Sequence, residues 1–135
     1  MKHALNDGIA DILSQARTIA VVGISEKPYR TSYAIAEELH DAGYTVIPVN
    51  PGLTEWNGIT AYPDLRSIPV HVDIVNVFRR SEYVSEITDA AIAIGAGTLW
   101  TQFGVVDMDA ARRALDHGLR VVMDRCISIE LSLIM

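Results

Sequence analysis

The chain has 135 residues, 50% of them apolar and 21% charged, which is the composition of a globular protein and excludes a disordered chain. Its 17 acidic and 11 basic residues give a formal net charge of −6, which argues against a surface that binds nucleic acid. The single cysteine excludes an internal disulfide framework. This length suits one core, and we expect a single domain over residues 1–135.

The N-terminal residues, MKHALNDG, contain no apolar core of the length found in signal peptides. The longest weakly polar stretch, Ala90–Trp100, is too short to cross a bilayer and contains two glycines. We therefore expect a cytoplasmic protein with no membrane partner.

In chain order, apolar residues at helical and strand spacing alternate along the sequence. The spacing predicts an opening helix over residues 4–16, despite Gly8. Short apolar runs predict strands at Thr18–Gly23, Tyr44–Val49, Val72–Phe78, Gly97–Thr101 and Leu119–Met123. Helices are expected at Ser32–Ala42, Ser81–Ile94 with Ser81 as its N-cap, Met108–His117 and Cys126–Met135. Residues 52–63 form a loop with a short strand at Ile59–Ala61, followed by one helical turn at Asp64–Ile68.

Strands that are apolar throughout and alternate with helices indicate a parallel sheet that is covered on both faces. We predict an α/β fold: a Rossmann-like, doubly wound, mostly parallel five-stranded sheet with helices on both faces. In such a sheet a ligand binds at the carboxyl ends of the strands. The candidate site therefore consists of the stretches that follow the strands: Gly23–Arg30, Asn50–Gly52, Phe78–Arg80, Thr101–Gly104 and Asp124–Cys126.

The stretch Thr18–Arg30 has the outline of an anion site. Its apolar strand ends at Gly23 and a helix begins soon afterwards, so backbone N–H groups and the positive end of the helix dipole meet at the turn. Lys27 and Arg30 add positive charge to this turn, and Ser25 adds a hydroxyl group. We predict that the turn holds phosphate.

A nicotinamide dinucleotide is the first ligand to compare with this turn. Its fingerprint, G-x-G-x-x-G, requires glycine at three positions that are Gly23, Ser25 and Pro28 here, so only the first matches. The acidic residue expected at the end of the second strand is replaced by Asn50. The phosphate loop G-x-x-x-x-G-K-[ST] is absent as well. The turn therefore suits a nucleotide that carries more phosphate than NAD.

Five separated motifs follow one another between Thr18 and Glu130: G-I-S-E-K-P-Y-R-T-S, P-V-N-P, N-V-F-R, T-L-W-T-Q-F-G-V and V-V-M-D-R-C. In their order and spacing they resemble the small stand-alone CoA-binding proteins, a family similar to the CoA-binding domain of the succinyl-CoA synthetase alpha subunit. The resemblance implies that coenzyme A binds across the carboxyl edge of the sheet. Two positions depart from the family: Gly52, where members often carry lysine, and Asn76, where they often carry aspartate.

The resemblance also implies which residues contact each part of the coenzyme. These are Gly23, Ser25, Lys27 and Arg30 for the phosphates, Val49, Asn50, Pro51, Phe78 and Arg79 for the walls around the adenosine, and Trp100 and Gln102 for the pantetheine arm. These assignments have plainer alternatives: Lys27, Arg30 and Arg79 can be ordinary surface side chains, and Ser25 can simply cap its turn. Asn50 between prolines can serve only as a turn residue, and Phe78 can serve only in the core.

The single cysteine, Cys126, follows the last predicted strand and opens the last predicted helix. A lone cysteine is usually a small buried apolar residue. The alternative is a redox role, in which Cys126 forms a mixed disulfide with the thiol of coenzyme A. The four histidines lack the spacing of metal ligands, so no metal site is predicted.

We interpret the sequence as a module that binds coenzyme A or an acyl-CoA and that is not an enzyme. A ligase of the synthetase kind needs a phosphorylated histidine and a nucleotide-grasp domain, for which 135 residues leave no room. The alternatives are a small oxidoreductase or redox sensor that binds NADP through Lys27 or Arg30, and an oligomeric scaffold with a vestigial pocket. A homo-oligomer and an unidentified protein partner both stay open; no nucleic acid and no membrane is expected as a partner.

Overall fold

The computed structural model describes residues 3–135, so the first two residues of the expected domain, and of the stretch compared with signal peptides, lie outside the description. A five-stranded sheet forms the centre, and each neighbouring pair of its strands is parallel. The strands lie in the order β2-β1-β5-β6-β7, with bounds Thr18–Val22 for β1, Thr45–Val49 for β2, Ile74–Val77 for β5, Thr98–Thr101 for β6 and Arg120–Val122 for β7. This arrangement confirms the predicted fold class.

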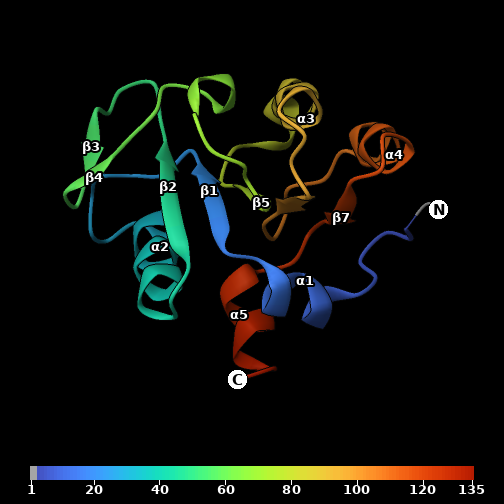
Figure 1. Ribbon diagram of the computed structural model, residues 1–135, viewed down its shortest axis with the longest axis horizontal. Coiled ribbons are helices and arrows are strands. Elements are labelled where there is room, and N and C mark those ends of the chain that lie inside the picture. Colours follow the sequence, from blue (N-terminus) through green and yellow to red (C-terminus); the bar gives the residue numbers. More distant parts are fainter. Residues whose placement is uncertain (1–2) are drawn as a thin grey trace.

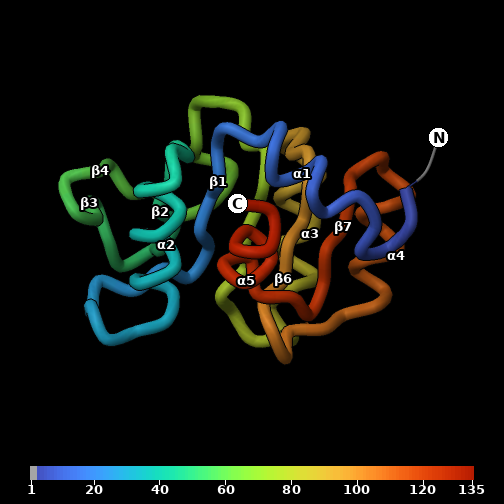
Figure 2. The backbone as a smooth tube through the Cα atoms, turned by 90° about the horizontal axis from the view of Figure 1, so that it is seen from below, coloured from blue at the N-terminus to red at the C-terminus, as the bar shows by residue number. Residues whose placement is uncertain are grey.

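Helices cover both faces of the sheet, as Figure 1 shows. One layer consists of α1 (Ile9–Gln15), α2 (Thr31–Asp41) and α5 (Ile127–Ser132), with α5 between the other two (Figures 1 and 2). The opposite layer consists of α3 (Val84–Ala93) and α4 (Met108–Asp116), which pack on each other. In the described residues, no helix has both the length and the apolar character needed to cross a membrane.

Alternation of side chains along the strands creates the two cores. In β1, Ile19 and Val21 belong to the core under α1, α2 and α5, whereas Ala20 and Val22 belong to the core under α3 and α4. All four side chains are buried, which explains why the strand is apolar throughout instead of alternating with polar residues.

The order of the strands creates a switch point between β1 and β5. The chain leaves β1 through α2 toward β2 on one side, and it then returns across β1 to β5. The connections after β1 and β5 therefore depart in opposite directions, which opens a crevice at the carboxyl ends of these two strands. Gly23 and Phe78 are the first residues after the two strands, so they lie at the crevice.

The observed elements differ from the prediction near the N-terminus and after β5. Helix α1 begins at Ile9 and not at residue 4, because Gly8 is its N-cap and has a left-handed conformation with φ 65°. The helix expected from Ser81 begins as a 3-10 turn, η2 (Ser81–Tyr83), before α3. Ser81 is not an N-cap; its hydroxyl instead accepts the N–H of Val106 at 2.9 Å and so ties the β5–α3 and β6–α4 loops together.

The loop over residues 52–63 contains an antiparallel hairpin of β3 (Glu55–Trp56) and β4 (Ile59–Thr60), where only a short strand was expected. Asn57 and Gly58 form its tight turn, both with positive φ. The predicted helical turn is the 3-10 helix η1 (Leu65–Ser67), which the carboxylate of Asp64 caps. At the C-terminus, α5 ends at Ser132, three residues before Met135, where the predicted helix ends.

Asp73 fastens β1 to β5 at the amino edge of the sheet, opposite the crevice. One of its carboxylate oxygens accepts the backbone N–H groups of Arg17 at 2.8 Å and of Thr18 at 3.0 Å. Partial burial by itself raises the pKa of Asp73, but these hydrogen bonds, the Thr18 hydroxyl and the charge of His71 outweigh it and lower the pKa.

We expect Asp73→Asn to lower the free energy of unfolding at pH 7 by about 1–2 kcal/mol, because it removes a charged acceptor of two N–H groups. The pKa of Asp73 is lower in the folded than in the unfolded chain, so its stabilisation is full above about pH 4 and is lost as the pH falls through the folded value. Urea unfolding of both proteins at pH 7 and pH 3 measures this. The gap between the two proteins should be smaller at pH 3 than at pH 7; an equal gap at both pH values would contradict the assignment.

Candidate ligand-binding site

Three hollows adjoin one another at the carboxyl edge of the sheet. The first hollow, of about 520 Å³, lies over the turn between β1 and α2; the second, of about 250 Å³, lies over the ends of β1 and β2; the third, of about 530 Å³, lies beyond β5 and β6. Gly23 lines the first and second hollows, Phe78 the first and third, and Arg79 the second and third. Each pair of hollows therefore shares a wall residue, and the three together are called the groove around the switch point.

Hydrogen bonds within the turn between β1 and α2 hold its shape. The hydroxyl of Ser25 accepts the N–H of Lys27 at 3.0 Å, and the N–H of Ser25 donates to the hydroxyl of Ser32 at 3.0 Å. Arg30 is the N-cap of α2, and no side chain caps this helix. The N–H groups of its first turn and the positive end of its dipole therefore face the first hollow without a side-chain acceptor.

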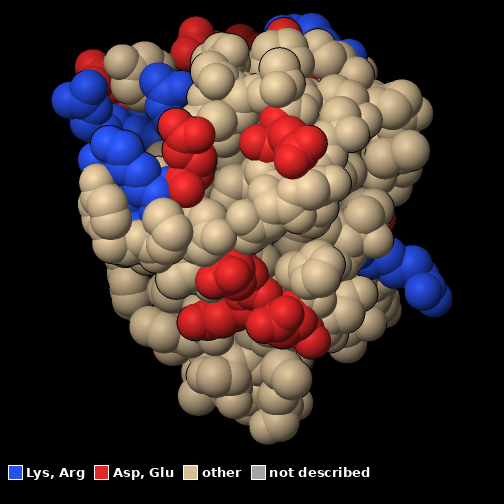
Figure 3. Space-filling view, turned by 90° about the vertical axis from the view of Figure 1, so that its left-hand side faces the viewer, with Lys and Arg blue, Asp and Glu red and all other residues tan. Residues whose placement is uncertain are grey.

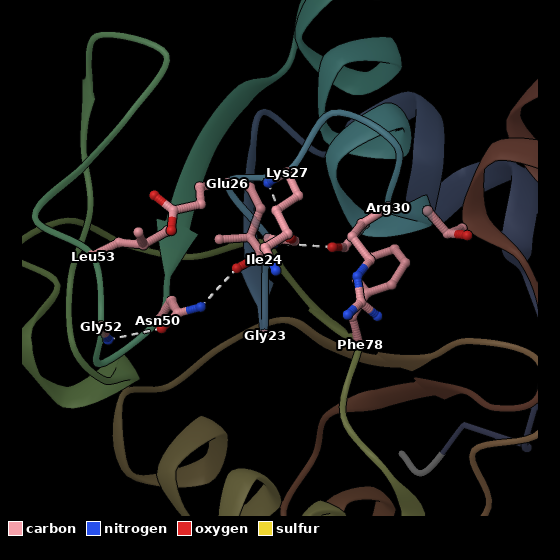
Figure 4. A pocket seen from close by; sticks show the side chains of 12 residues that line it. Gly23, Ile24, Glu26, Lys27, Arg30, Asn50, Gly52, Leu53 and Phe78 are labelled. Atoms are coloured by element: carbon pink, nitrogen blue, oxygen red, sulfur yellow. Dashed lines mark hydrogen bonds between the residues drawn. The ribbon is translucent and has the colours of Figure 1, made fainter.

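A second set of hydrogen bonds ties this turn to the loop after β2. The side-chain N–H of Asn50 donates to the carbonyl of Ile24 at 2.8 Å, and its Oδ1 accepts the N–H of Gly52 at 2.8 Å, as the dashed lines in Figure 4 show. The indole of Trp56 donates to the carbonyl of Ser25 at 3.1 Å. Both polar atoms of the Asn50 side chain are therefore hydrogen-bonded to backbone groups. Asn50 shapes the hollow by holding the two loops together. These bonds hold the turn in this shape without a ligand.

The first hollow carries more positive than negative side chains. Lys27 and Arg30 are exposed and line it together with one acid, Glu26, which the sequence reasoning did not weigh. In Figure 4, Arg30 and Phe78 lie on one side of the hollow, and Asn50 lies on the other. Across the described residues, neither Lys27 nor Arg30 makes an ion pair, so both charges are available to an anion. Figure 3 shows Lys and Arg side chains gathered at the upper left of one face, with acidic side chains directly beside them and a further acidic group lower down.

Gly23 is required where it stands for two reasons. Its φ of 86° lies in the left-handed region, and a Cβ there would lie 2.7 Å from the carbonyl oxygen of Phe78 and 2.8 Å from Cδ of Arg79. The close approach of the two strand ends thus depends on the missing side chain. Arg79 is itself held in place, because its guanidinium lies over the ring of Tyr83 at 4.0 Å.

The structure brings together all but one of the residues predicted for the site. They are Gly23, Ser25, Lys27, Arg30, Asn50 and Phe78 in the first hollow, Gly23, Val49, Pro51 and Arg79 in the second, and Phe78, Arg79, Gln102 and Cys126 in the third. Trp100 is the exception, and its expected place near a ligand is corrected. It is fully buried inside β6, in the core beneath α1, α2 and α5, and its indole N–H donates to the carbonyl of Arg125 at 2.8 Å. Trp100 is therefore a core residue.

Sequence reasoning missed Leu53 and gave no role to Phe103, although Phe103 lies within the candidate stretch Thr101–Gly104. Leu53 lines the first hollow, and Phe103, whose side chain is 63% exposed, lines the third. An aromatic residue in a turn directly after a strand was the available signal for Phe103. The described residues contain no group of three or more His, Cys, Asp or Glu side chains that could hold a metal ion.

Strand order and groove are those of a Rossmann-like α/β domain with a candidate ligand site at its switch point. Residues 17–132 match the model of the family described as CoA binding domain, and the chain belongs to this family. The resemblance inferred from the five motifs is thereby confirmed.

Relatives of the same length and of greater length carry this domain. The uncharacterized protein YneT of Bacillus subtilis is 40% identical over 129 residues, which cover 96% of each chain. A solved structure of a hypothetical protein from Pyrococcus horikoshii is 32% identical, has a TM-score of 0.91, and is matched over 99% of this chain and 98% of that one. The alpha subunit of ADP-forming acetate–CoA ligase II from Pyrococcus furiosus is 26% identical, and the match covers 88% of this chain but only 28% of that subunit. These comparisons lend no support to the NADP-binding alternative.

Proposed function

We propose that this chain binds coenzyme A in the groove at the carboxyl edge of its sheet and acts as a binding module without catalysis of its own. The observation that carries the proposal is the turn between β1 and α2. It combines a backbone held by hydrogen bonds, an uncapped helix N-terminus and the cations Lys27 and Arg30, neither of which makes an ion pair within residues 3–135. Membership of the CoA-binding family supports this choice of ligand.

The phosphates fit the first hollow in this proposal. Helix N–H groups bind phosphate oxygens well, and Lys27 and Arg30 supply charge-assisted hydrogen bonds. Gly52 lines this hollow at the position where the resemblance implies a lysine. In this proposal the positive charge comes instead from Arg30, which lines the same hollow, and from Arg79, which lines the second.

The base and the arm of the coenzyme fit the remaining hollows. The second hollow has an apolar floor that includes Val49, Leu65 and Ile87, which suits a planar base. The third hollow is lined by Phe78 and Phe103, which suit the apolar parts of the pantetheine arm. Because the hollows share lining residues, one extended molecule can occupy all three.

Thermal unfolding with CoA, acetyl-CoA, NADP, NAD and ATP side by side tests this function. A ligand at about 100 times its Kd stabilises the fold by about 2.7 kcal/mol, which raises Tm by several degrees. We expect this rise with CoA, and none with NAD, because the turn lacks the glycines and the acid that NAD requires. A rise with NADP and none with CoA would overturn the proposal.

A further inference from the structure

The side-chain amide of Gln102 is fixed in orientation within the third hollow. Its Oε1 accepts the side-chain N–H of Asn76 at 3.0 Å and the backbone N–H of Ile127 at 3.1 Å. A backbone N–H only donates, so the atom facing Ile127 must be the oxygen of the amide. The NH₂ group of Gln102 therefore points away from these partners.

This NH₂ group is a donor without a partner in the described part of the chain. Gln102 is only 8% exposed, yet it lines the third hollow. Its nitrogen is not among the unpaired side-chain atoms that are sealed from solvent in the described residues, which are Asn76 Oδ1, Thr88 Oγ1 and Arg120 Nε. The hollow is therefore the side from which a ligand can reach this nitrogen. A buried amide donor gains most from a carbonyl oxygen.

The one cysteine of the chain lies beside this donor. Cys126 is half-buried, lines the same hollow and directly precedes Ile127, whose N–H binds Gln102. In the pantetheine arm, the amide nearest the thiol is separated from the sulfur by only two methylene groups. A ligand carbonyl bound to the Gln102 amide therefore leaves its sulfur close to the sulfur of Cys126.

We propose that the NH₂ group of Gln102 binds the terminal carbonyl of the pantetheine arm and that Cys126 forms a mixed disulfide with coenzyme A. This inference rests on the proposed function. The co-reactant is CoA disulfide. The Cys126 thiolate attacks one sulfur, the CoA–CoA disulfide bond breaks, and the Cys126–CoA bond forms. The second CoA leaves as a thiolate and takes up one proton, equal to the one that Cys126 gave up. The exchange involves no net gain or loss of electrons.

Non-reducing mass spectrometry of the full chain with CoA disulfide tests this. We expect one CoA on Cys126, removable by dithiothreitol, and none on Cys126→Ser. Glutathione disulfide should react at least about tenfold more slowly, since it lacks the nucleotide and the arm. Gln102→Glu keeps the oxygen that accepts from Asn76 and Ile127 but removes the NH₂ donor, so its reaction with CoA disulfide should slow about tenfold, and its reaction with glutathione disulfide should not change.

Three outcomes overturn the inference: no CoA adduct, equal rates with the two disulfides, or equal slowing of both disulfides in Gln102→Glu. The last outcome means that Gln102 acts only on the fold around Cys126. Calorimetric titration of the wild-type chain with reduced CoA and excess reductant separates this result from the proposed function. If reduced CoA binds but no adduct forms, the proposed function holds and the mixed disulfide is rejected. If reduced CoA does not bind and no adduct forms, both the proposed function and the mixed disulfide are rejected.

Discussion

Replacing Lys27 and Arg30 together by alanine is expected to weaken CoA binding about 100-fold. Both side chains line the first hollow, and no ion pair in the described residues competes for them. A phosphate contact from an exposed cation contributes about 1.4 kcal/mol, or about tenfold in Kd, and two contacts multiply. Isothermal titration calorimetry at fixed ionic strength measures the loss, since salt screens exposed charges.

A matched control removes the same net charge elsewhere. Arg17 lies before β1 at the amino edge, and Arg112 lies on α4 in an exposed pair with Asp109. Arg17→Ala with Arg112→Ala should leave the Kd for CoA within about twofold. If this control loses as much affinity as the variant of Lys27 and Arg30, the effect comes from net charge and not from contacts in the first hollow.

Two further titrations locate the contacts. Arg30→Ala should weaken CoA more than dephospho-CoA if Arg30 binds the 3′-phosphate, and should weaken both equally if it binds the pyrophosphate. Gly52→Lys adds a cation to the first hollow, where a Cβ would meet only Asn50 Oδ1 at 3.3 Å, and should tighten CoA binding several-fold. Unchanged affinity in both Arg30→Ala and Gly52→Lys would show that the phosphates do not bind in this hollow.

Gly23→Ala is expected to lower the free energy of unfolding by about 3 kcal/mol. The left-handed φ of 86° costs a residue with a Cβ about 1 kcal/mol or more, and a contact of 2.7 Å with the backbone oxygen of Phe78 forces β1 and β5 apart. Because the three hollows meet at this point, the variant should also bind CoA at least tenfold more weakly where it is still folded. Urea unfolding and calorimetry measure the two effects.

Gly118→Ala separates the two causes. Gly118 has nearly the same φ, 87°, but a Cβ there would meet nothing within 4 Å. Its variant should therefore lose only the conformational part, about 1–2 kcal/mol, and keep its affinity for CoA. Equal destabilisation of the two variants would show that the approach of the strand ends does not depend on Gly23.

Sequence reasoning placed the candidate site at the carboxyl edge because parallel strands end there together, so residues after separate strands meet. The structure brings Gly23, Asn50, Phe78 and Gln102 to this edge. Trp100 was assigned through the family resemblance and not through this logic, since the predicted strand already ran to Thr101, where β6 ends. The Trp100 side chain is fully buried and enters the core.

The hydrogen-bond partners of side chains could not be predicted from the sequence for a different reason. Asn50 uses both polar ends on the backbone of two loops, and Ser81 accepts a bond from Val106, 25 residues along the chain. Such pairs form only after the strands assemble, so the conformational preferences of the local sequence do not predict them. The same holds for the NH₂ of Gln102, which has no partner within residues 3–135 and whose orientation is defined by partners from β5 and α5.

The central claim is that coenzyme A binds at the carboxyl edge of the sheet, at the switch point between β1 and β5. An NMR titration of the labelled chain with reduced CoA tests it most directly, because each backbone amide reports its own surroundings. We expect the largest shifts at Ser25, Lys27, Thr31 and Phe78, with Thr18 and Asp73 at the amino edge unchanged. Shifts concentrated around Asp73, or no shifts at millimolar CoA, would contradict the account.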